Sequence, residues 1–210
     1  MSGSSGEPNW VVWARRLRAI AQTGLTYGES EYDLERYRQI RQVADEILSE
    51  YAAVDHPEIQ DFFASDSGYA TPQVDVRGAV FRDDQILLVR ERLDGLWTLP
   101  GGYADVNDAP SEAVEREIQE ESGLTTRAIK LAMVYDKRRH DHPPAPRHTY
   151  KLFFVCELIG GELATSFETT DVGFFCPDAL PGLSTHRVTA AQIQRLYDHL
   201  RDLSLPTDFD

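Results

Sequence analysis

The sequence predicts an α/β fold in which a mixed sheet carries helices on both faces, preceded by a small N-terminal helical domain. Three observations support this prediction. Apolar residues recur at three- and four-residue spacing between residues 10 and 51, short β-branched and aromatic runs begin at Gln73, and two more helical patterns lie among and after those runs. Strands mixed with helices in this way are typical of a sheet covered on both sides.

The apolar pattern of the N-terminal part predicts a helical hairpin. Met1 to Gly6 has the composition of a flexible linker, so we expect residues 1–6 to lie outside the fold, residues 7–66 to form the helical domain and residues 72–210 to form the α/β domain. Gly24 and Gly28 are predicted to bracket the turn of the hairpin, and a short helix is predicted from Pro57 to Ala64. The apolar stripes of the hairpin are Trp10, Trp13, Ala14, Leu17, Ile20 and Ala21, then Leu34, Tyr37, Ile40, Ala44, Ile47, Leu48 and Tyr51.

The rest of the chain reads as strands with two helices. The predicted helices cover about Pro110 to Ser122 and Thr189 to Leu203. The predicted strands are Val74 to Phe81, Ile86 to Arg90, Ile129 to Tyr135, Tyr150 to Leu158 and Val172 to Phe175.

Composition excludes several classes of function. With 210 residues and 41% hydrophobic residues the chain is long enough for an ordinary globular core, and we expect a cytoplasmic protein without a membrane segment or signal peptide. The net charge of −14 disfavours binding to duplex nucleic acid, which relies on clustered Lys and Arg. Cys156 and Cys176 both lie in apolar, strand-like contexts and are expected to be buried free thiols.

The segment Gly101 to Leu124 carries the chemistry. A glycine turn leads into a helix on which Glu117, Glu120 and Glu121 share one face, because residues three and four apart are neighbours on a helix. Such glutamates are often only a solvated face, but like charges at this spacing destabilise a bare helix and favour a compensating cation. Oxygen ligands without Cys or His favour Mg²⁺ or Mn²⁺.

The spacing around this helix resembles the Nudix box. The matching positions are Gly102, Asp108, Arg116, Glu117, Ile118, Glu120, Glu121, Gly123 and Leu124. Asp108 stands where the box usually has Glu. The structural ion pair expected with Arg116 must therefore form from a side chain that is one methylene shorter. Ala109, where Ser commonly caps the helix, is a second departure, although Pro110 suits the first helical position.

This resemblance implies a Nudix α/β/α sandwich that hydrolyses a nucleoside diphosphate linked to another moiety. It implies that Glu117, Glu120 and Glu121 hold divalent metal with the carbonyl of Gly101, while Arg116 positions the helix. Glu120 and Glu168 are the candidates for the general base, and Glu168 has two alternatives, a further metal ligand or an ordinary surface residue.

The chain also resembles a narrower Nudix group that has an N-terminal helical extension and includes ADP-ribose and CDP-choline pyrophosphatases. The resemblance covers nearly everything after Gly6, in segments such as RLDGLWTLPGG, HDHPP and ETTDVGFF. In related proteins the extension contributes to dimers, so the resemblance implies a homodimer. Two alternatives stay open: a Nudix-fold regulator that binds nucleotides without catalysis, and a hydrolase acting on RNA ends.

Substrate contacts are predicted from charge and aromatic character. The basic cluster between Lys137 and His142 lies in a Pro-rich loop that could close over a phosphate or a sugar, or simply be solvated. The candidate arginines could instead pair with acidic neighbours, and the candidate tyrosines could instead be packing residues. The candidate substrate-binding residues are Arg77, Arg92, Tyr103, Tyr135, Lys137, Arg139 and His140.

Overall fold

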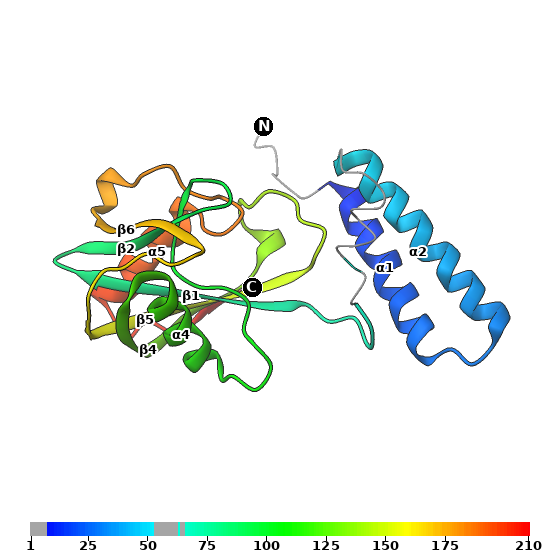
Figure 1. Cartoon of the computed structure of the whole chain (residues 1–210), viewed down its shortest axis with the longest axis horizontal. Helices are drawn as coiled ribbons and strands as arrows, with labels where there is room; N and C mark the ends of the chain where they lie inside the picture. The colour runs from blue at the N-terminus through cyan, green and yellow to red at the C-terminus, as the bar shows by residue number, and fades with distance from the viewer. Residues whose placement is uncertain (1–7, 53–62, 64–65) are drawn as a thin grey trace. The chain divides into compact units, whose positions relative to one another are not determined.

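The computed structural model describes residues 8–52, 63 and 66–210. The chain divides into two compact units (Figure 1). The first combines Met1–Pro72 with Pro144–His148, and the second combines Gln73–Pro143 with Thr149–Asp210.

The first unit contains the predicted helical hairpin, α1 (Asn9–Tyr27) and α2 (Glu31–Ala52). Ala14, Leu48 and Phe63 form its small buried core. The prediction for Gly24 was wrong: this glycine lies inside α1, and a Cβ there would come within 2.5 Å of the Tyr37 ring, so it permits close packing of α2 rather than breaking α1. Gly28 does end the helix. The helix predicted from Pro57 to Ala64 lies outside the described residues, apart from Phe63.

The second unit is built on a mixed seven-stranded sheet, with β3-β2-β1-β5-β4-β7 side by side and β6 paired with β2. The pairs β1–β5 and β4–β7 are parallel, and the other pairs are antiparallel. The strands are β1 (Gln73–Arg82), β2 (Gln85–Glu91), β3 (Trp97–Thr98), β4 (Leu124–Asp136), β5 (Thr149–Gly161), β6 (Thr169–Phe175) and β7 (Asp208–Phe209).

Helices α4 (Pro110–Ser122) and α5 (Ala190–Arg201) cover opposite faces of this sheet. Alternation along β5 shows this, because Phe153 packs in the cluster that contains α5 and Phe154 packs in the cluster that contains α4. The predicted α/β/α sandwich with a mixed sheet is confirmed. Not predicted were β3, β7 and the short 3₁₀ helices η1 (Lys137–Arg139) and η2 (Pro177–Ala179).

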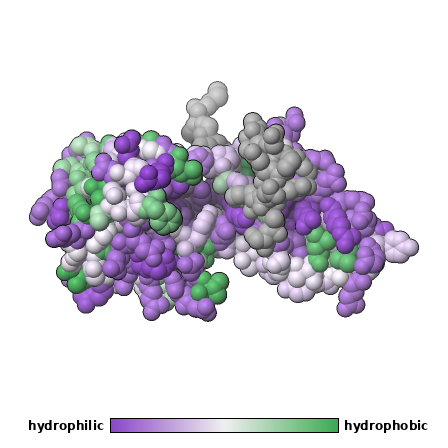
Figure 2. Space-filling view, in the orientation of Figure 1, coloured by the Kyte–Doolittle hydropathy of each residue, from purple (hydrophilic) through white to green (hydrophobic). Residues whose placement is uncertain are grey.

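The surface agrees with the acidic composition. In the view of Figure 2 hydrophilic residues dominate and hydrophobic ones form small patches. No helix in the described part of the chain is both long and apolar enough to cross a bilayer. Cys156 is buried as expected, but the expectation for Cys176 was wrong, because its side chain is exposed at the end of β6.

Candidate functional site

Helix α4 is held close to the sheet by its apolar face. Ala113, Val114 and Ile118 are fully buried, and a Cβ on Gly78 of β1 would lie 2.4 Å from Ile118 Cδ1. The helix begins at Pro110 and ends at Ser122, and Gly123 caps it in the left-handed conformation. Sheet and caps together therefore fix where the glutamates of α4 lie.

The glutamates of α4 meet the glycine turn that follows β3. Glu121 is 4% exposed, and its Oε2 accepts a hydrogen bond of 2.9 Å from the backbone N–H of Gly101. Gly101 has φ +141°, and a Cβ there would lie 2.0 Å from the Val76 carbonyl oxygen. At Gly102 a Cβ would lie 2.8 Å from Glu117 Oε2. Gly101 is therefore required for the turn to approach β1 this closely, whereas a Cβ at position 102 would displace only the carboxylate end of Glu117.

Arg116 joins four carboxylates beside the turn, one of which is Asp105, whose Oδ2 lies 3.3 Å from Nη2. Its Nη1 donates to Glu117 at 2.9 Å and to Glu120 at 3.3 Å, while Nε donates to Asp108 at 3.2 Å. The ion pair between Asp108 and Arg116 is therefore present, despite the shorter side chain. Glu120, unlike Glu121, is exposed.

The buried carboxylates lack full compensation by positive charge. Burial raises the pKa of Glu121 to about 8, against the opposing effects of Arg77 and the Gly101 N–H. Burial also raises the pKa of Glu117, against the opposing effect of Arg116. A set made of carboxylate and carbonyl oxygens suits a hard divalent cation, so the residues present fit Mg²⁺ or Mn²⁺. Within the described residues, however, no three His, Cys, Asp or Glu side chains already converge as a cation site.

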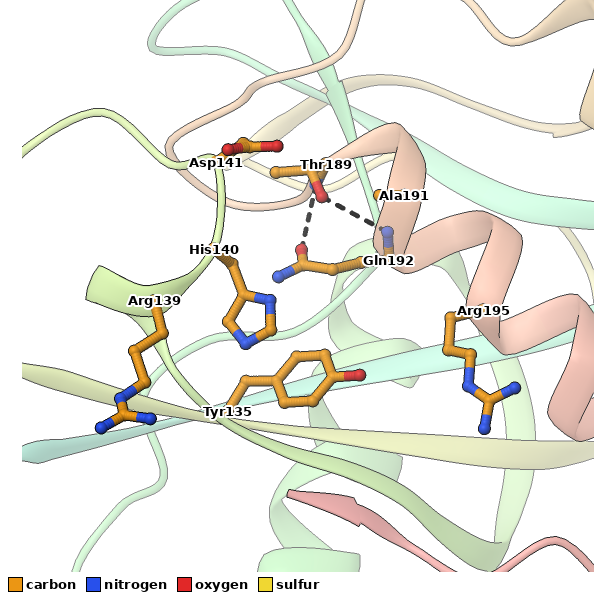
Figure 3. Close-up of a pocket in the computed structure, with 8 residues that line it drawn as sticks. All are labelled: Tyr135, Arg139, His140, Asp141, Thr189, Ala191, Gln192 and Arg195. Carbon is orange, nitrogen blue, oxygen red and sulfur yellow. Dashed lines mark hydrogen bonds between the residues drawn. The ribbon is translucent and has the colours of Figure 1, made fainter. Parts of the chain in front are cut away.

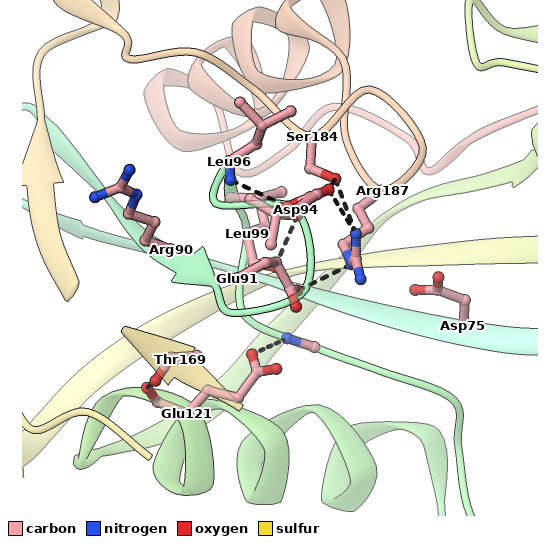
Figure 4. A network of polar contacts seen from close by, with 12 residues as sticks. Asp75, Arg90, Glu91, Asp94, Leu96, Leu99, Glu121, Thr169, Ser184 and Arg187 are labelled. Carbon is pink, nitrogen blue, oxygen red and sulfur yellow. Dashed lines mark hydrogen bonds and ion pairs between the residues drawn. The ribbon is translucent and has the colours of Figure 1, made fainter. Parts of the chain in front are cut away.

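A second charged network lies next to Glu121 and was missed by the sequence analysis (Figure 4). Glu91, at the end of β2, is 8% exposed and pairs with Arg187 at 2.9 Å. Arg187 also contacts Asp94 at 3.0 Å, and Asp94 accepts a hydrogen bond of 2.7 Å from the Ser184 hydroxyl. Burial raises the pKa of Glu91, opposed by Arg187 and Arg77. No periodicity or motif links residues that lie so far apart in the chain.

Arg77 and Tyr103 are both connected to Asp75. Arg77 is 5% exposed and forms a two-point ion pair with Asp75, with Nε–Oδ1 at 2.7 Å and Nη2–Oδ2 at 3.2 Å. It therefore has the acidic partner that the sequence left open. Tyr103 pairs with Asp75 through an isolated antiparallel bridge and is 54% exposed.

Arg92 and Glu168 belong to one loop contact. The Arg92 side chain donates to the Phe167 carbonyl at 2.7 Å, and its backbone N–H donates to the Glu168 carbonyl at 2.8 Å. The next residue, Thr169, donates from its hydroxyl to the Glu121 carbonyl at 3.0 Å. Arg92 thus holds the loop that carries Glu168, and this loop is anchored on the end of α4. The Glu168 side chain itself is exposed.

Tyr135, Arg139 and His140 line a pocket of about 170 Å³ at the N-terminus of α5 (Figure 3). The rings of Tyr135 and His140 stack with centroids 3.8 Å apart. His140 Nε2 also lies 3.2 Å from an oxygen of Asp210. Lys137 opens η1, in the same segment. The other residues of the pocket are Asp141, Thr189, Ala191, Gln192 and Arg195.

Comparison with known proteins decides the family. The family model described as NUDIX domain matches residues 71–197, which include the glycine turn and all of α4. The chain belongs to the Nudix hydrolase family. A second model, described as a UDP-X-like, N-terminal oligomerisation domain, matches residues 8–63.

Several relatives of this Nudix chain are similar over most of their length. A putative ADP-ribose pyrophosphatase, YjhB of Bacillus subtilis, is 44% identical over 97% of this chain and 98% of its own. The crystal structure of a UDP-X diphosphatase is 33% identical, with a TM-score of 0.63 over 96% of this chain and 98% of its own. An ADP-ribose pyrophosphatase structure from Streptococcus suis is 39% identical, with a TM-score of 0.62 over 67% of this chain and 100% of its own.

Proposed function

We propose that the protein hydrolyses the pyrophosphate bond of a nucleoside diphosphate linked to another moiety, using Mg²⁺ or Mn²⁺ and releasing a nucleoside monophosphate. The observation that carries the proposal is the meeting of the α4 glutamates with the glycine turn, where Glu121 accepts the Gly101 N–H at 2.9 Å. The names of the relatives support this reaction class, with ADP-ribose and UDP-linked compounds as candidate substrates. CDP-choline stays a candidate from the sequence resemblance alone.

In this proposal Glu117, Glu120, Glu121 and the Gly101 carbonyl hold the metal. A bound divalent ion would supply positive charge to the diphosphate and lower the pKa of an attacking water. Glu120 reaches the set by leaving Arg116, whose Nη1 also contacts Glu117 and can keep that second contact. Arg116, held by Asp108, bridges Glu117 and Glu120 and so holds both carboxylates on one face of α4.

The general base is proposed to be Glu120 or Glu168, whose carboxylate oxygen would take the proton from water. The exposed position of both side chains allows this role. Glu168 sits on the loop that Thr169 anchors to the Glu121 carbonyl, which favours a position near the reaction. Tyr103, Lys137 and the pocket residues Tyr135, Arg139 and His140 remain the proposed contacts for the rest of the substrate.

We further infer that α1 and α2 mediate a homodimer. The match of residues 8–63 to an oligomerisation domain supports this inference. Large apolar side chains on α1 are exposed, with Trp13 at 57%, Ile20 at 53% and Tyr27 at 66%. Ile20 and Tyr27 line a hollow of about 550 Å³ in the helical unit. Light scattering on the purified protein would test the dimer, and a monomer at micromolar concentration would refute it.

The activity is tested with a panel of ADP-ribose, CDP-choline and a UDP-sugar, each with Mg²⁺ and with Mn²⁺. Glu120→Gln and Glu121→Gln are compared with Glu112→Gln, a control on the same helix whose side chain accepts the Ala109 N–H at 3.0 Å. We expect one preferred substrate, release of a nucleoside monophosphate, and loss of activity in the first two variants alone.

Two results would refute this function. Nucleotide binding without turnover, equal in all variants, would favour the regulator. Turnover of a 5′-capped or triphosphorylated RNA, with none of the small conjugates cleaved, would favour action on RNA ends.

A further inference from the structure

Three charged side chains lie buried together on the α5 face of the sheet. Lys151 of β5 is fully buried, and its Nζ donates to Asp75 Oδ2 at 2.8 Å. Asp75 and Lys151 are direct neighbours in the parallel β1–β5 register. Asp75 also receives the two N–H groups of Arg77. Burial alone would raise the pKa of Asp75, but Arg77 and Lys151 outweigh it and hold that pKa at about 2.

Arg77 connects this cluster to the glycine turn. While Nε and Nη2 bind Asp75, Nη1 donates to the Leu99 carbonyl at 3.1 Å. The next carbonyls of the turn are held by β1, since Gly78 N–H binds Pro100 at 2.9 Å and Val76 N–H binds Gly102 at 2.8 Å. Of the four carbonyls from Leu99 to Gly102, that of Gly101 has no such bond among the described residues.

We infer that Arg77 and Asp75 are positioning residues for the metal site, an inference that rests on the proposed function. Asp75 holds the guanidinium of Arg77 in one orientation, and Arg77 fixes the Leu99 carbonyl at the entry to the turn. The Gly101 carbonyl, which no N–H of β1 binds among the described residues, is thereby left available to a cation, while the Gly101 N–H stays on Glu121. Groups that orient metal ligands in this way typically change metal affinity 10–100-fold when they are altered.

The contacts of Arg77 also fix a positive charge near the carboxylates of the site. The guanidinium of Arg77 interacts electrostatically with Glu121, Glu117 and Glu91. Because Arg77 is 5% exposed and three of its N–H groups are bound within the protein, its orientation is set before any substrate arrives. A guanidinium that binds a phosphate at two points needs N–H groups that are exposed and not already bound. The buried and bound guanidinium of Arg77 does not offer them.

The test uses Arg77→Lys, which keeps the charge but cannot bind Asp75 at two points and Leu99 as well. Asp75→Asn is the second variant, because it keeps the shape of the side chain and removes its charge. Lys130→Met is the control, since it removes bonds from Nζ to the Leu203 and Leu205 carbonyls, away from the turn. Mn²⁺ binding to each folded protein is measured without substrate, from the electron paramagnetic resonance signal of free Mn²⁺, together with its thermal unfolding.

We expect the Mn²⁺ dissociation constant to rise about tenfold or more in Arg77→Lys and Asp75→Asn, and to stay unchanged in Lys130→Met even if that variant is less stable. At saturating Mn²⁺ the substrate KM of Arg77→Lys should lie within about twofold of wild type. Wild-type Mn²⁺ affinity in both variants would overturn the inference, as would a raised KM at unchanged Mn²⁺ affinity. Failure of the proposed function looks different, because the wild-type protein and Glu121→Gln would then bind Mn²⁺ equally poorly.

Discussion

Gly78→Ala should push α4 off the sheet. The added Cβ would lie 2.4 Å from Ile118 Cδ1, 2.9 Å from Ile118 Cγ1 and 3.1 Å from Val114 Cγ2, whereas carbon atoms pack best at about 3.5–4.0 Å. Both neighbours are fully buried, so neither side chain has free space to turn into. Overpacking of this kind costs about 1–3 kcal/mol, which exceeds the roughly 0.5–1 kcal/mol usually gained when a strand glycine becomes alanine.

A second substitution makes this prediction specific. Ile118→Val removes Cδ1, the nearest atom, at a cost of about 0.5–1.5 kcal/mol on its own. The double variant should lose less unfolding free energy than the two single variants together, by about 0.5 kcal/mol or more. The reason is that the new methyl group at position 78 enters the space that Cδ1 vacated. Gly160→Ala is the control, since a Cβ at that position meets no atom within 4 Å.

Urea unfolding followed by circular dichroism measures all four variants, with equal m-values as the condition for comparing them. Close packing of α4 against Gly78 is refuted if Gly78→Ala is as stable as Gly160→Ala, or if Ile118→Val adds its full cost to that of Gly78→Ala.

Two further predictions concern stability. His142 donates from Nδ1 to the Thr185 carbonyl and receives Gln192 Nε2 at its own Nε2, which requires a neutral ring. Burial lowers the pKa of His142 to about 4, below its value of 6.5 when unfolded, so its contribution is complete above pH 6.5 and is lost as pH falls towards 4. Allowing for partial exposure, the unfolding free energy should fall by about 1–2 kcal/mol over that range, and by less in His142→Gln. Urea unfolding at several pH values measures this, and an equal fall in the two proteins would contradict it. Ala109 cannot cap α4 with its side chain, although its N–H already binds Glu112 Oε2 at 3.0 Å. Ala109→Ser should complete this capping box and stabilise the protein by about 1 kcal/mol, seen as a higher Tm by calorimetry, and an unchanged Tm would refute the expected cap.

The sequence was most informative where the structure depends on local spacing. The α4 helix could be predicted because its apolar positions, Pro110 and Gly123 all lie within one short segment. The ion pair between Asp108 and Arg116 could be predicted for the same reason. Gly24 was misjudged because a glycine that admits a neighbouring ring looks the same in sequence as one that ends a helix.

Long-range partners could not be predicted. Lys151 stands in a run that indicates a strand, and a lysine there is usually expected to reach solvent. Only the β1–β5 register places it against Asp75. Glu91 and Arg187 form their pair across almost half the chain for the same physical reason. Sequence spacing therefore located the carboxylates of the site, while the groups that surround them required the fold.

The helical unit is discontinuous in the chain, because Pro144–His148 belongs to it. Arg15 donates to the Ala145 carbonyl at 2.9 Å, and Arg147 pairs with Asp66 at 2.9 Å. A single cut before Gln73 would therefore remove Arg15 and Asp66, while their partners in residues 144–148 would stay in the chain between η1 and β5. In evolutionary terms the two modules are not freely exchangeable: recombination that replaces the N-terminal helices must also replace or adapt five residues inside the hydrolase gene segment.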